Sequence, residues 1–310
     1  MKLSRSSEPG ADPLSDILSA LGACATRPGW LEAASDWALA FPALDRLKFV
    51  AVLRGACWLL ASGQQPQYLS AGDVVLIGRT DYVVASDLTV PPVDGLPLHQ
   101  QGGDRLRLGG DDTLLLGGGV AFTWGIQAFL LDMLPPVLVV ARASSTAGVV
   151  ASVLALLDRE AHEPGLGSEA VTARLAELLV VEAIRFHAGK AGADRTGWLG
   201  ALADPRIGRA LRSLHADIAR PWTVATLAAE AGMSRATFSA AFHRLVGRSP
   251  LAYLRLWRLT LARARLAAGA PVASTAADVG YTSQSAFGNA YRRAFGISPG
   301  AEERRQSRTA

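Results

Sequence analysis

A stretch of 25 residues occurs twice in the last third of the chain, and this duplication constrains the fold more than any other feature of the sequence. The first copy, AAEAGMSRATFSAAFHRLVGRSPLA, covers residues 228–252, and the second, AADVGYTSQSAFGNAYRRAFGISPG, covers residues 276–300. Gly232 and Gly280 occupy the same place in the two copies and are 48 positions apart. Because such repeats mark one structural unit used again, this part of the chain is predicted to contain two similar small domains.

Each copy predicts a helix, a tight turn and a second helix. In the first copy, TVATLAAEA precedes Gly232, a residue type that readily adopts the left-handed turn conformation, and SRATFSAAFHRLV follows with Ser234 as its N-cap. The second copy repeats this order around Gly280. In helix–turn–helix units the second helix enters the DNA major groove. A long helical pattern over residues 249–269 separates the copies, and we expect it to hold two reading helices about one DNA turn apart, roughly 34 Å.

The charge of the chain is divided unevenly between its two parts. Residues 201–310 contain 16 arginines, no lysine and six acidic residues, which gives a net charge of +10. Residues 1–200 contain 15 basic and 21 acidic residues, which gives −6. A basic module joined to an acidic one predicts that only the C-terminal part contacts a polyanion such as double-stranded DNA.

Residues 222–304 resemble the DNA-binding domain of the AraC/XylS family of transcription regulators. The motifs that carry the resemblance are WTVATLAAEAGMSRATFSAAFHRLVGRSPLAYLRLWRLTLARARL and PVASTAADVGYTSQSAFGNAYRRAFGISPG. The resemblance implies a sequence-specific DNA-binding regulator, with RNA polymerase as a further candidate partner. Thr275 departs from the family pattern, which has an aliphatic residue there, so its helix is expected to pack less well.

The outward positions of the two reading helices are the candidate DNA contacts. Small side chains in the first copy favour methyl and phosphate contacts, whereas the amides of Gln284 and Asn289 in the second can pair with adenine edges. For each charged candidate, a solvated side chain without a DNA role is the alternative. The predicted DNA-binding set is Arg235, Ala236, Ser239, Ala240, His243, Arg248, Arg258, Ser283, Gln284, Ser285, Asn289 and Arg292.

The upstream part of the chain has a different pattern. Between Trp37 and about Val140, short apolar segments alternate with glycine, proline and aspartate, which predicts an antiparallel sandwich or barrel. The polar segment TVPPVDGLPLHQQGGDRL within it is predicted to be a mobile loop. Two amphipathic helices are predicted next, in ASVLALLDREAH and EAVTARLAELLVVEAIRFHAG. The stripe on the second, over residues 168–188, is wide enough for either intrachain packing or a homodimer interface.

Residues 12–190 resemble the cupin-like sensor domain that one branch of the same family carries, in stretches such as FPALDRLKFVAVLRGACWLLASG and LSAGDVVLIGRTDYVVASD. The predicted fold is therefore α+β and multidomain. An N-terminal antiparallel, cupin-like β-barrel with flanking helices would sense an effector and dimerise. A linker at residues 191–203 would join it to an all-α DNA-binding domain at residues 204–305 with two helix–turn–helix units.

DNA binding is expected to respond to a small ligand or a redox signal at the N-terminal domain. Cys24 and Cys57 are the redox candidates, with two small buried thiols as the alternative. Ordinary core packing is likewise the alternative for the aromatic residues that could line an effector pocket. These are Trp37, Phe49, Trp58, Phe122 and Trp124.

Neither a metal nor another cofactor is expected. Tyr82 stands where metal-binding cupins often have a histidine, and His99 is the one histidine elsewhere in the predicted barrel. No nucleophile–base pair or phosphate-binding loop is visible, so the chain is not expected to be an enzyme. A cupin-type metal-dependent enzyme with a helical accessory domain is the alternative from another class, and a protein that sequesters a partner through its long helices is a third.

The bulk sequence favours a cytoplasmic protein. The first residues contain no apolar run of the signal-peptide type, and no stretch reaches the ~18 apolar residues that a transmembrane helix needs.

Overall fold

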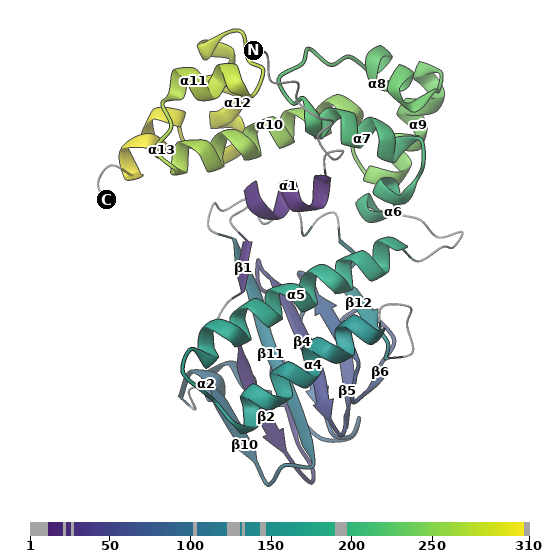
Figure 1. The fold of residues 1–310 in the computed structure, drawn as a ribbon, viewed down its shortest axis with the longest axis vertical. Coiled ribbons are helices and arrows are strands. Elements are labelled where there is room, and N and C mark those ends of the chain that lie inside the picture. The colour runs from purple at the N-terminus through teal and green to yellow at the C-terminus, as the bar shows by residue number, and fades with distance from the viewer. Residues whose placement is uncertain are drawn as a thin grey trace, which may run out of the picture. The chain divides into compact units, whose positions relative to one another are not determined.

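The structure is a computed structural model, and it describes residues 12–20, 23–25, 28–101, 104–122, 131, 134–142, 147–189 and 197–306. The described residues divide into two compact units. One, the sheet module, comes from residues 24–121 and 134–191, and the other, the helical module, comes mainly from residues 197–306 (Figure 1). This agrees with the predicted α+β, multidomain class.

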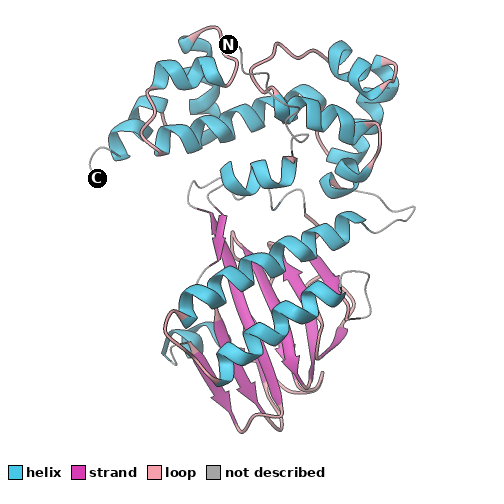
Figure 2. Cartoon of the chain, in the orientation of Figure 1, coloured by secondary structure: helices cyan, strands magenta, loops and turns pink. Residues whose placement is uncertain are grey.

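The sheet module is built from two β-sheets, drawn in magenta in Figure 2. A seven-stranded sheet has the order β10-β2-β11-β4-β7-β12, with β1 paired to β11, and a five-stranded sheet has the order β6-β5-β8-β3-β9. The strands are β1 (Ala23–Ala25), β2 (Gly29–Ala33), β3 (Ala38–Phe41), β4 (Leu47–Arg54), β5 (Ala56–Ala61), β6 (Gln67–Ser70), β7 (Val74–Ile77), β8 (Tyr82–Ala85), β9 (Val93–Asp94), β10 (Arg105–Leu108), β11 (Thr113–Phe122) and β12 (Val137–Val140).

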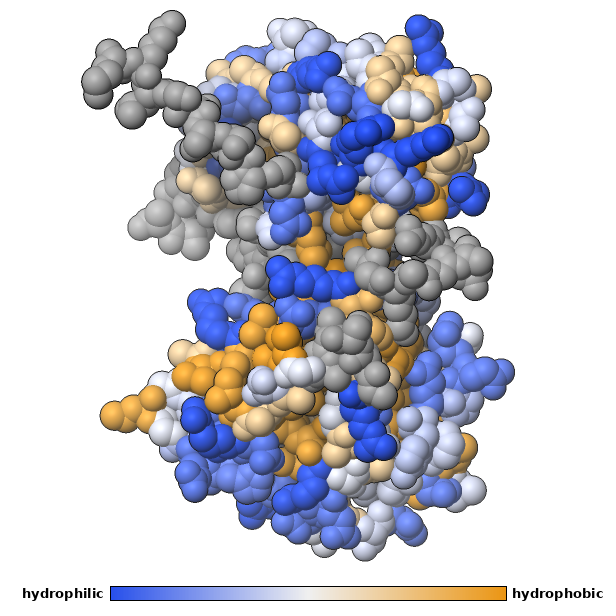
Figure 3. Space-filling model, turned by 45° about the vertical axis from the view of Figure 1, so that its right-hand side comes forward, coloured by the Kyte–Doolittle hydropathy of each residue, from blue (hydrophilic) through white to orange (hydrophobic). Residues whose placement is uncertain are grey.

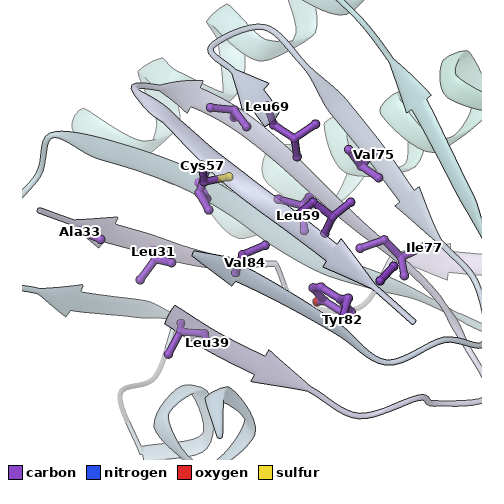
Figure 4. Packing of buried hydrophobic residues seen from close by; sticks show 14 of the residues in the cluster. Leu31, Ala33, Leu39, Cys57, Leu59, Leu69, Val75, Ile77, Tyr82 and Val84 are labelled. Carbon is purple, nitrogen blue, oxygen red and sulfur yellow. The ribbon is translucent and has the colours of Figure 1, made fainter. Parts of the chain in front are cut away.

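The apolar core of this module lies between the two sheets. Leu31 and Val75 from the larger sheet meet Cys57, Leu59 and Val84 from the smaller one (Figure 4). Strand β5 alternates half-buried and buried residues, as expected for a strand with one face on the core. Strands β4 and β7 are buried almost throughout, because helices α4 (Ala147–His162) and α5 (Ser168–Gly189) pack on their sheet. Both helices were predicted from their periodicity, and both are confirmed.

Two details of the predicted barrel need correction. Among the described residues the strands form two separate sheets rather than one closed ring. The segment predicted as a mobile loop contains β9, helix α2 (Gly95–Gln101) and β10, and carries the chain from the edge of one sheet to the edge of the other. Strand β9 pairs with β3, and β10 with β2, both in parallel, so the sheets are not purely antiparallel. Glu32 on β2 holds the second pair through ion pairs with Arg105 and Arg107.

The helical module is built around one long helix, α10 (Pro250–Ala267), which links two groups of shorter helices (Figure 1). The first group is α6 (Trp198–Ala203), α7 (Ile207–Ala216), α8 (Val224–Ala231) and α9 (Arg235–Val246). The second group is α11 (Val272–Asp278), α12 (Gln284–Phe295) and α13 (Pro299–Gln306). Each group packs on its own part of α10.

The helical module begins earlier than the predicted boundary at residue 204. Helix α6 lies in the predicted linker, and its Trp198 side chain is fully buried. The Trp198 Nε1 donates a hydrogen bond to the Tyr253 hydroxyl at 3.0 Å, and that hydroxyl lies 2.8 Å from the His215 Nε2. Helices α6, α7 and α10 are therefore connected by one buried series of polar side-chain contacts.

The N-terminal helix α1 (Pro13–Ala20) lies within residues 12–190, the range that was predicted to form the cupin-like domain. It belongs instead to the helical module, where it contacts α7 and α10. Asp16 on α1 lies 3.4 Å from the Nδ1 of His215.

Candidate nucleic-acid interface and effector cavity

The first helix–turn–helix unit is closed at its ends by local hydrogen bonds. The Thr223 side chain accepts from the Thr226 backbone N–H at 3.1 Å, and the Thr226 side chain accepts from the Thr223 N–H at 2.9 Å. This reciprocal capping box satisfies two N–H groups that have no partner inside helix α8. Gly232 ends that helix in the left-handed conformation, with φ 64°. Ser234 then caps α9 by accepting from the Thr237 N–H at 3.2 Å, as the sequence predicted.

The second unit repeats this path with fewer capping bonds. Helix α11 has Pro271 at its N-cap and no side-chain hydrogen bond there. The chain turns at Gly280, whose φ of 81° is again in the left-handed region. Ser283 caps α12 by accepting from the Ala286 N–H at 3.4 Å.

The buried faces of α9 and α12 lock both helices in place. Phe238 and Phe242 on α9, and Phe287 and Tyr291 on α12, have at most 1% of their surface exposed. Because these residues recur at helical spacing, they determine which face of each helix remains outside.

The structure places most of the predicted DNA-binding residues on those outer faces. Within the described residues the side chains of Gln284, Asn289 and Arg292 have no hydrogen-bond or ion-pair partner, whereas Ser283 and Ser285 lie 2.8 Å apart. Ser239 is half-buried. The exposed members of the set are Arg235, Ala236, Ala240, His243, Arg248, Ser283, Gln284, Ser285, Asn289 and Arg292.

Arg258 differs from the rest of the predicted set. Its side chain is half-buried and donates to backbone carbonyls of Ile218, Arg220 and Gly280. The sequence could not reveal these partners, because they lie 22 to 40 positions away.

The predicted weak point at Thr275 is visible in the structure. Its side chain is fully buried in the second unit, and its Oγ1 has no hydrogen-bond partner. An aliphatic residue there would fill similar space without burying an unpaired hydroxyl.

A cavity of about 350 Å³ opens in the sheet module. Its wall is mostly apolar and includes Leu31, Val84 and Leu115. Gly118 lines it as well, and a Cβ there would lie 2.7 Å from the Phe49 ring, so glycine is needed where the strand passes that ring.

One end of this cavity is polar and basic. The Lys48 Nζ donates to the backbone carbonyls of Pro42 and Thr80 at 3.0 and 3.1 Å and lies 4.7 Å from the centre of the Tyr82 ring. Burial, with a contribution from Arg46, lowers the pKa of Lys48 to about 8, so its ammonium stays mostly protonated at pH 7. The Arg46 Nε is buried without a hydrogen-bond partner. Two cationic residues, a phenol and one acidic residue, Asp104, thus line a mostly apolar chamber.

Three of the aromatic residues predicted as effector contacts, Trp37, Phe49 and Trp58, have described side chains, and none of the three lines this cavity. Trp37 and Phe49 are buried in the sheet module, and Trp58 is half-buried against Tyr68. Phe122 ends β11 but its side chain, like Trp124, lies outside the described residues. The sequence signal that was missed is the pair Arg46 and Lys48, two positions apart at the start of a strand, which places both side chains on one face.

Cys57 is buried between the sheets with none of its surface exposed. Burial, together with the nearby charge of Asp73, raises the pKa of its thiol to about 12. Because the thiolate is the form that oxidants attack, Cys57 is protected from them. Cys24 lies in β1, and its side chain lies outside the described residues.

The described residues contain no group of three or more histidines, cysteines or acidic residues placed to hold a metal ion. None of their helices combines the length and the apolar character that crossing a membrane requires.

Two helix–turn–helix units on one linking helix, in a chain that also contains a β-sandwich module, are the architecture of a DNA-binding transcription regulator. The family description "Cupin" matches residues 12–189, and "Helix-turn-helix domain" matches residues 227–305. The chain belongs to the AraC-like transcription regulators that carry a cupin domain.

A relative that matches nearly the whole chain supports this assignment, and two further similar proteins are given after it. An AraC-like transcription regulator of Streptomyces antibioticus is 40% identical over 294 residues, which is 93% of this chain and 97% of that protein. The HTH-type transcriptional regulator AlkR of Acinetobacter baylyi is 29% identical over 87% of this chain and 92% of its own. The solved DNA-binding domain of AdpA, in complex with a target DNA, is 31% identical over 32% of this chain and 89% of that chain, with a TM-score of 0.31.

Proposed function

We propose that α9 and α12 are the two reading helices of this transcription regulator and that α12 supplies most of the base recognition. The observation that carries this is the pair of unpartnered amides, Gln284 and Asn289, held outward by the buried rings of Phe287 and Tyr291. Both amides can form two hydrogen bonds to an adenine edge in the major groove. Ser283 and Ser285, at the N-terminal end of the same helix, would contact base edges or phosphates.

We call each helix–turn–helix unit a head, and the first head, formed by α8 and α9, would mainly bind the DNA backbone. The outer face of α9 presents small side chains, Ala236, Ser239 and Ala240, which allow close approach and methyl contacts. Cationic or polar groups next to them would bind phosphates. These are Arg235, His243 and Arg248, and Arg292 has the same role in the second head.

A titration of fluorescent duplex DNA at several salt concentrations tests the electrostatic part of this proposal. Each phosphate contact releases counterions, so the affinity should fall steeply with salt, by about 10³-fold between 50 and 200 mM if six or more phosphates are held. Arg292→Met should reduce the slope of log affinity against log salt by about 1. The matched control is Arg185→Met, which removes an exposed arginine from α5 and should leave the slope unchanged. A salt-independent affinity would refute the proposal.

We propose that the cavity of the sheet module is the effector site and that its ligand combines an apolar body with an anionic head. The apolar wall would hold the body, and Lys48, Arg46 and the Tyr82 hydroxyl would hold the head. Burial raises the pKa of Tyr82, so that hydroxyl remains a neutral donor. A charge-assisted hydrogen bond in such a chamber is stronger than a neutral one. The burial of Cys57 favours this ligand signal over a redox signal at that residue.

Aliphatic and aromatic carboxylates, each compared with its uncharged methyl ester, would test the cavity. Calorimetry on the full chain should show that carboxylates bind about tenfold more tightly than their esters, because charged hydrogen bonds contribute roughly 1.5–3 kcal/mol. Lys48→Met should remove this difference, and Lys48→Arg should keep most of it. Equal binding of acids and esters to the wild-type chain would contradict an anionic head.

We also propose that the chain forms a homodimer through α4 and α5. Leu156 on α4 and Val171 and Leu178 on α5 remain exposed although they are apolar, with about two-fifths of their surface accessible. Figure 3 shows apolar surface gathered on the sheet module and hydrophilic surface over much of the helical module. A two-fold axis would place this patch against its own copy, which is the commonest symmetry of soluble oligomers. Sedimentation should show a dimer, and Leu178→Lys should dissociate it.

The remaining partners follow from the family. We propose that the protein acts in the cytoplasm, is not an enzyme, and changes initiation by RNA polymerase at the promoters that it binds. Transcription in vitro with purified polymerase, with and without the protein, measures that effect directly.

A further inference from the structure

Arg258 lies near the middle of α10, at the boundary between the two packed groups of helices. Its neighbour Trp257 stacks on His215 of the first group, with ring centres 4.8 Å apart. Its other neighbour, Leu259, belongs to the core of the second group, together with Phe287 and Tyr291.

The Arg258 guanidinium bridges these two groups through backbone carbonyls. Its Nε donates to the Ile218 carbonyl at 3.0 Å, and its Nη2 donates to the Arg220 carbonyl at 2.8 Å and to the Ala219 carbonyl at 3.4 Å. Its Nη1 donates to the Gly280 carbonyl at 3.3 Å. The first three carbonyls precede the first helix–turn–helix unit, and Gly280 is the turn of the second.

Both ends of this bridge are fixed to a reading unit. On the first side, Arg220 stacks on Trp222 and pairs with Glu230 of α8. On the second side, Gly280 approaches so closely that a Cβ would lie 2.6 Å from the Arg258 Nη2 and 2.7 Å from the Ala219 carbonyl oxygen. The turn of one head is therefore in direct contact with the approach to the other.

We propose that Arg258 is a positioning residue that fixes the separation and rotation of the two reading helices, and thereby the spacing between the two half-sites that the protein recognises on DNA. A single planar group with five N–H donors suits this role, because it can hold carbonyls from two directions at once, whereas a lysine ammonium cannot reproduce that fork. Its contacts are made to the protein backbone, so Arg258 acts on DNA through the placement of the two heads rather than by gripping phosphates. The inference rests on the proposed use of both α9 and α12.

Duplexes with altered half-site spacing test this role in the full-length protein. The starting duplex is the best binder selected from a random pool, and its variants have one or two base pairs inserted or removed between the half-sites, or one half-site scrambled. Wild type should lose about tenfold or more with each spacing change, because a rigid pair of heads then loses the benefit of simultaneous binding. Arg258→Met should weaken binding to the original duplex about tenfold and reduce the spacing penalty to about threefold, with single half-site binding unchanged.

Two further variants separate this role from loss of a charge or of the fold. Arg255→Met removes an exposed arginine three residues away on α10 and should leave the spacing penalty intact. Gly280→Ala keeps Arg258 but forces a Cβ into the bridge, so it should reproduce the spacing tolerance of Arg258→Met. Circular dichroism and melting curves identify any variant that is unfolded, and Arg258→Lys then replaces the methionine variant.

The opposing results are distinct from one another. If Arg258→Met weakens all duplexes equally, single half-sites included, then Arg258 is a DNA contact and the positioning role is wrong. If it leaves the spacing penalty at the wild-type value, the bridge does not determine the spacing. If wild type itself binds a duplex with one scrambled half-site as well as the original, then the proposed use of two heads fails, and the inference fails with it.

Discussion

The two helix–turn–helix units follow the same path but use their polar side chains differently. In the first unit polar groups complete the scaffold, through the capping box of Thr223 and Thr226, and the outer face of α9 carries small residues. In the second unit α11 has no side-chain cap and buries the unpaired hydroxyl of Thr275, while α12 presents free amides. The comparison teaches that the two copies of a duplicated unit can differ in role. One copy has the better-capped helices, and the other presents the side chains that can recognise bases.

The largest expected effect is a loss of discrimination between base pairs when the amides of α12 are removed. Gln284→Ala and Asn289→Ala should each relax discrimination at the contacted base pair by about 1–3 kcal/mol, because each removes a bidentate pairing with a base edge. Ser239→Ala in the first head should change specificity by much less, since that side chain is half-buried and short. Competitive binding to a library of single-base variants of the selected site measures both.

The result for the two α12 variants can also contradict the proposed difference between the two helix–turn–helix units. If the two α12 variants weaken binding to every sequence by the same factor, those amides contact only the backbone. The division between a reading head and a holding head is then wrong.

The features that could be predicted from the sequence are those that depend on near neighbours. Gly232, Ser234 and Gly280 each act within a few residues, so the turns and the α9 cap could be placed correctly. The buried face of α9 is also a local feature, because Phe238 and Phe242 lie four positions apart, one helical turn, and both are buried.

The features that could not be predicted depend on distant partners. Helix α6 was assigned to a linker because the burial of Trp198 depends on Tyr253, 55 positions later. The crossing from β9 to β10 resembled a loop, since its parallel pairing with β3 and β2 leaves no local signal. The basic end of the cavity was missed for the same reason, as Lys48 is held by the Thr80 carbonyl 32 positions away.

The second-largest expected effect is a change in the stability of the second helix–turn–helix unit. Thr275→Val should stabilise it by about 1–2 kcal/mol, because the variant keeps the shape and removes a buried hydroxyl that has no partner. The matched control is Thr260→Val, since Thr260 is equally buried but donates to the Leu256 carbonyl at 2.9 Å. That variant should be neutral or destabilising. Native-state hydrogen exchange of the α11 and α12 amides measures the local free energy of opening.

The sign of this result decides whether the second scaffold is the weaker one. Slower exchange in α11 for Thr275→Val, without a change in α8, would locate the weakness in the second unit. Faster exchange would show that the threonine hydroxyl is satisfied in solution, and the two scaffolds would then be equal in this respect.

The smallest expected effect distinguishes the caps of the two reading helices. Ser234→Ala should destabilise α9 by about 1 kcal/mol, and Ser283→Ala should destabilise α12 by roughly half of that, within the range measured for N-caps. The physical reason is the length of each capping bond, which is 3.2 Å in the first unit and 3.4 Å in the second. The second contact of each cap hydroxyl, with the Thr237 hydroxyl in the first unit and the Ser285 hydroxyl in the second, is 2.8 Å long in both. Exchange rates of the first-turn amides in each helix, compared between the two variants, measure the difference. Equal losses would mean that the better scaffold of the first unit comes from its capping box alone, because the reading helices themselves would then be capped equally well.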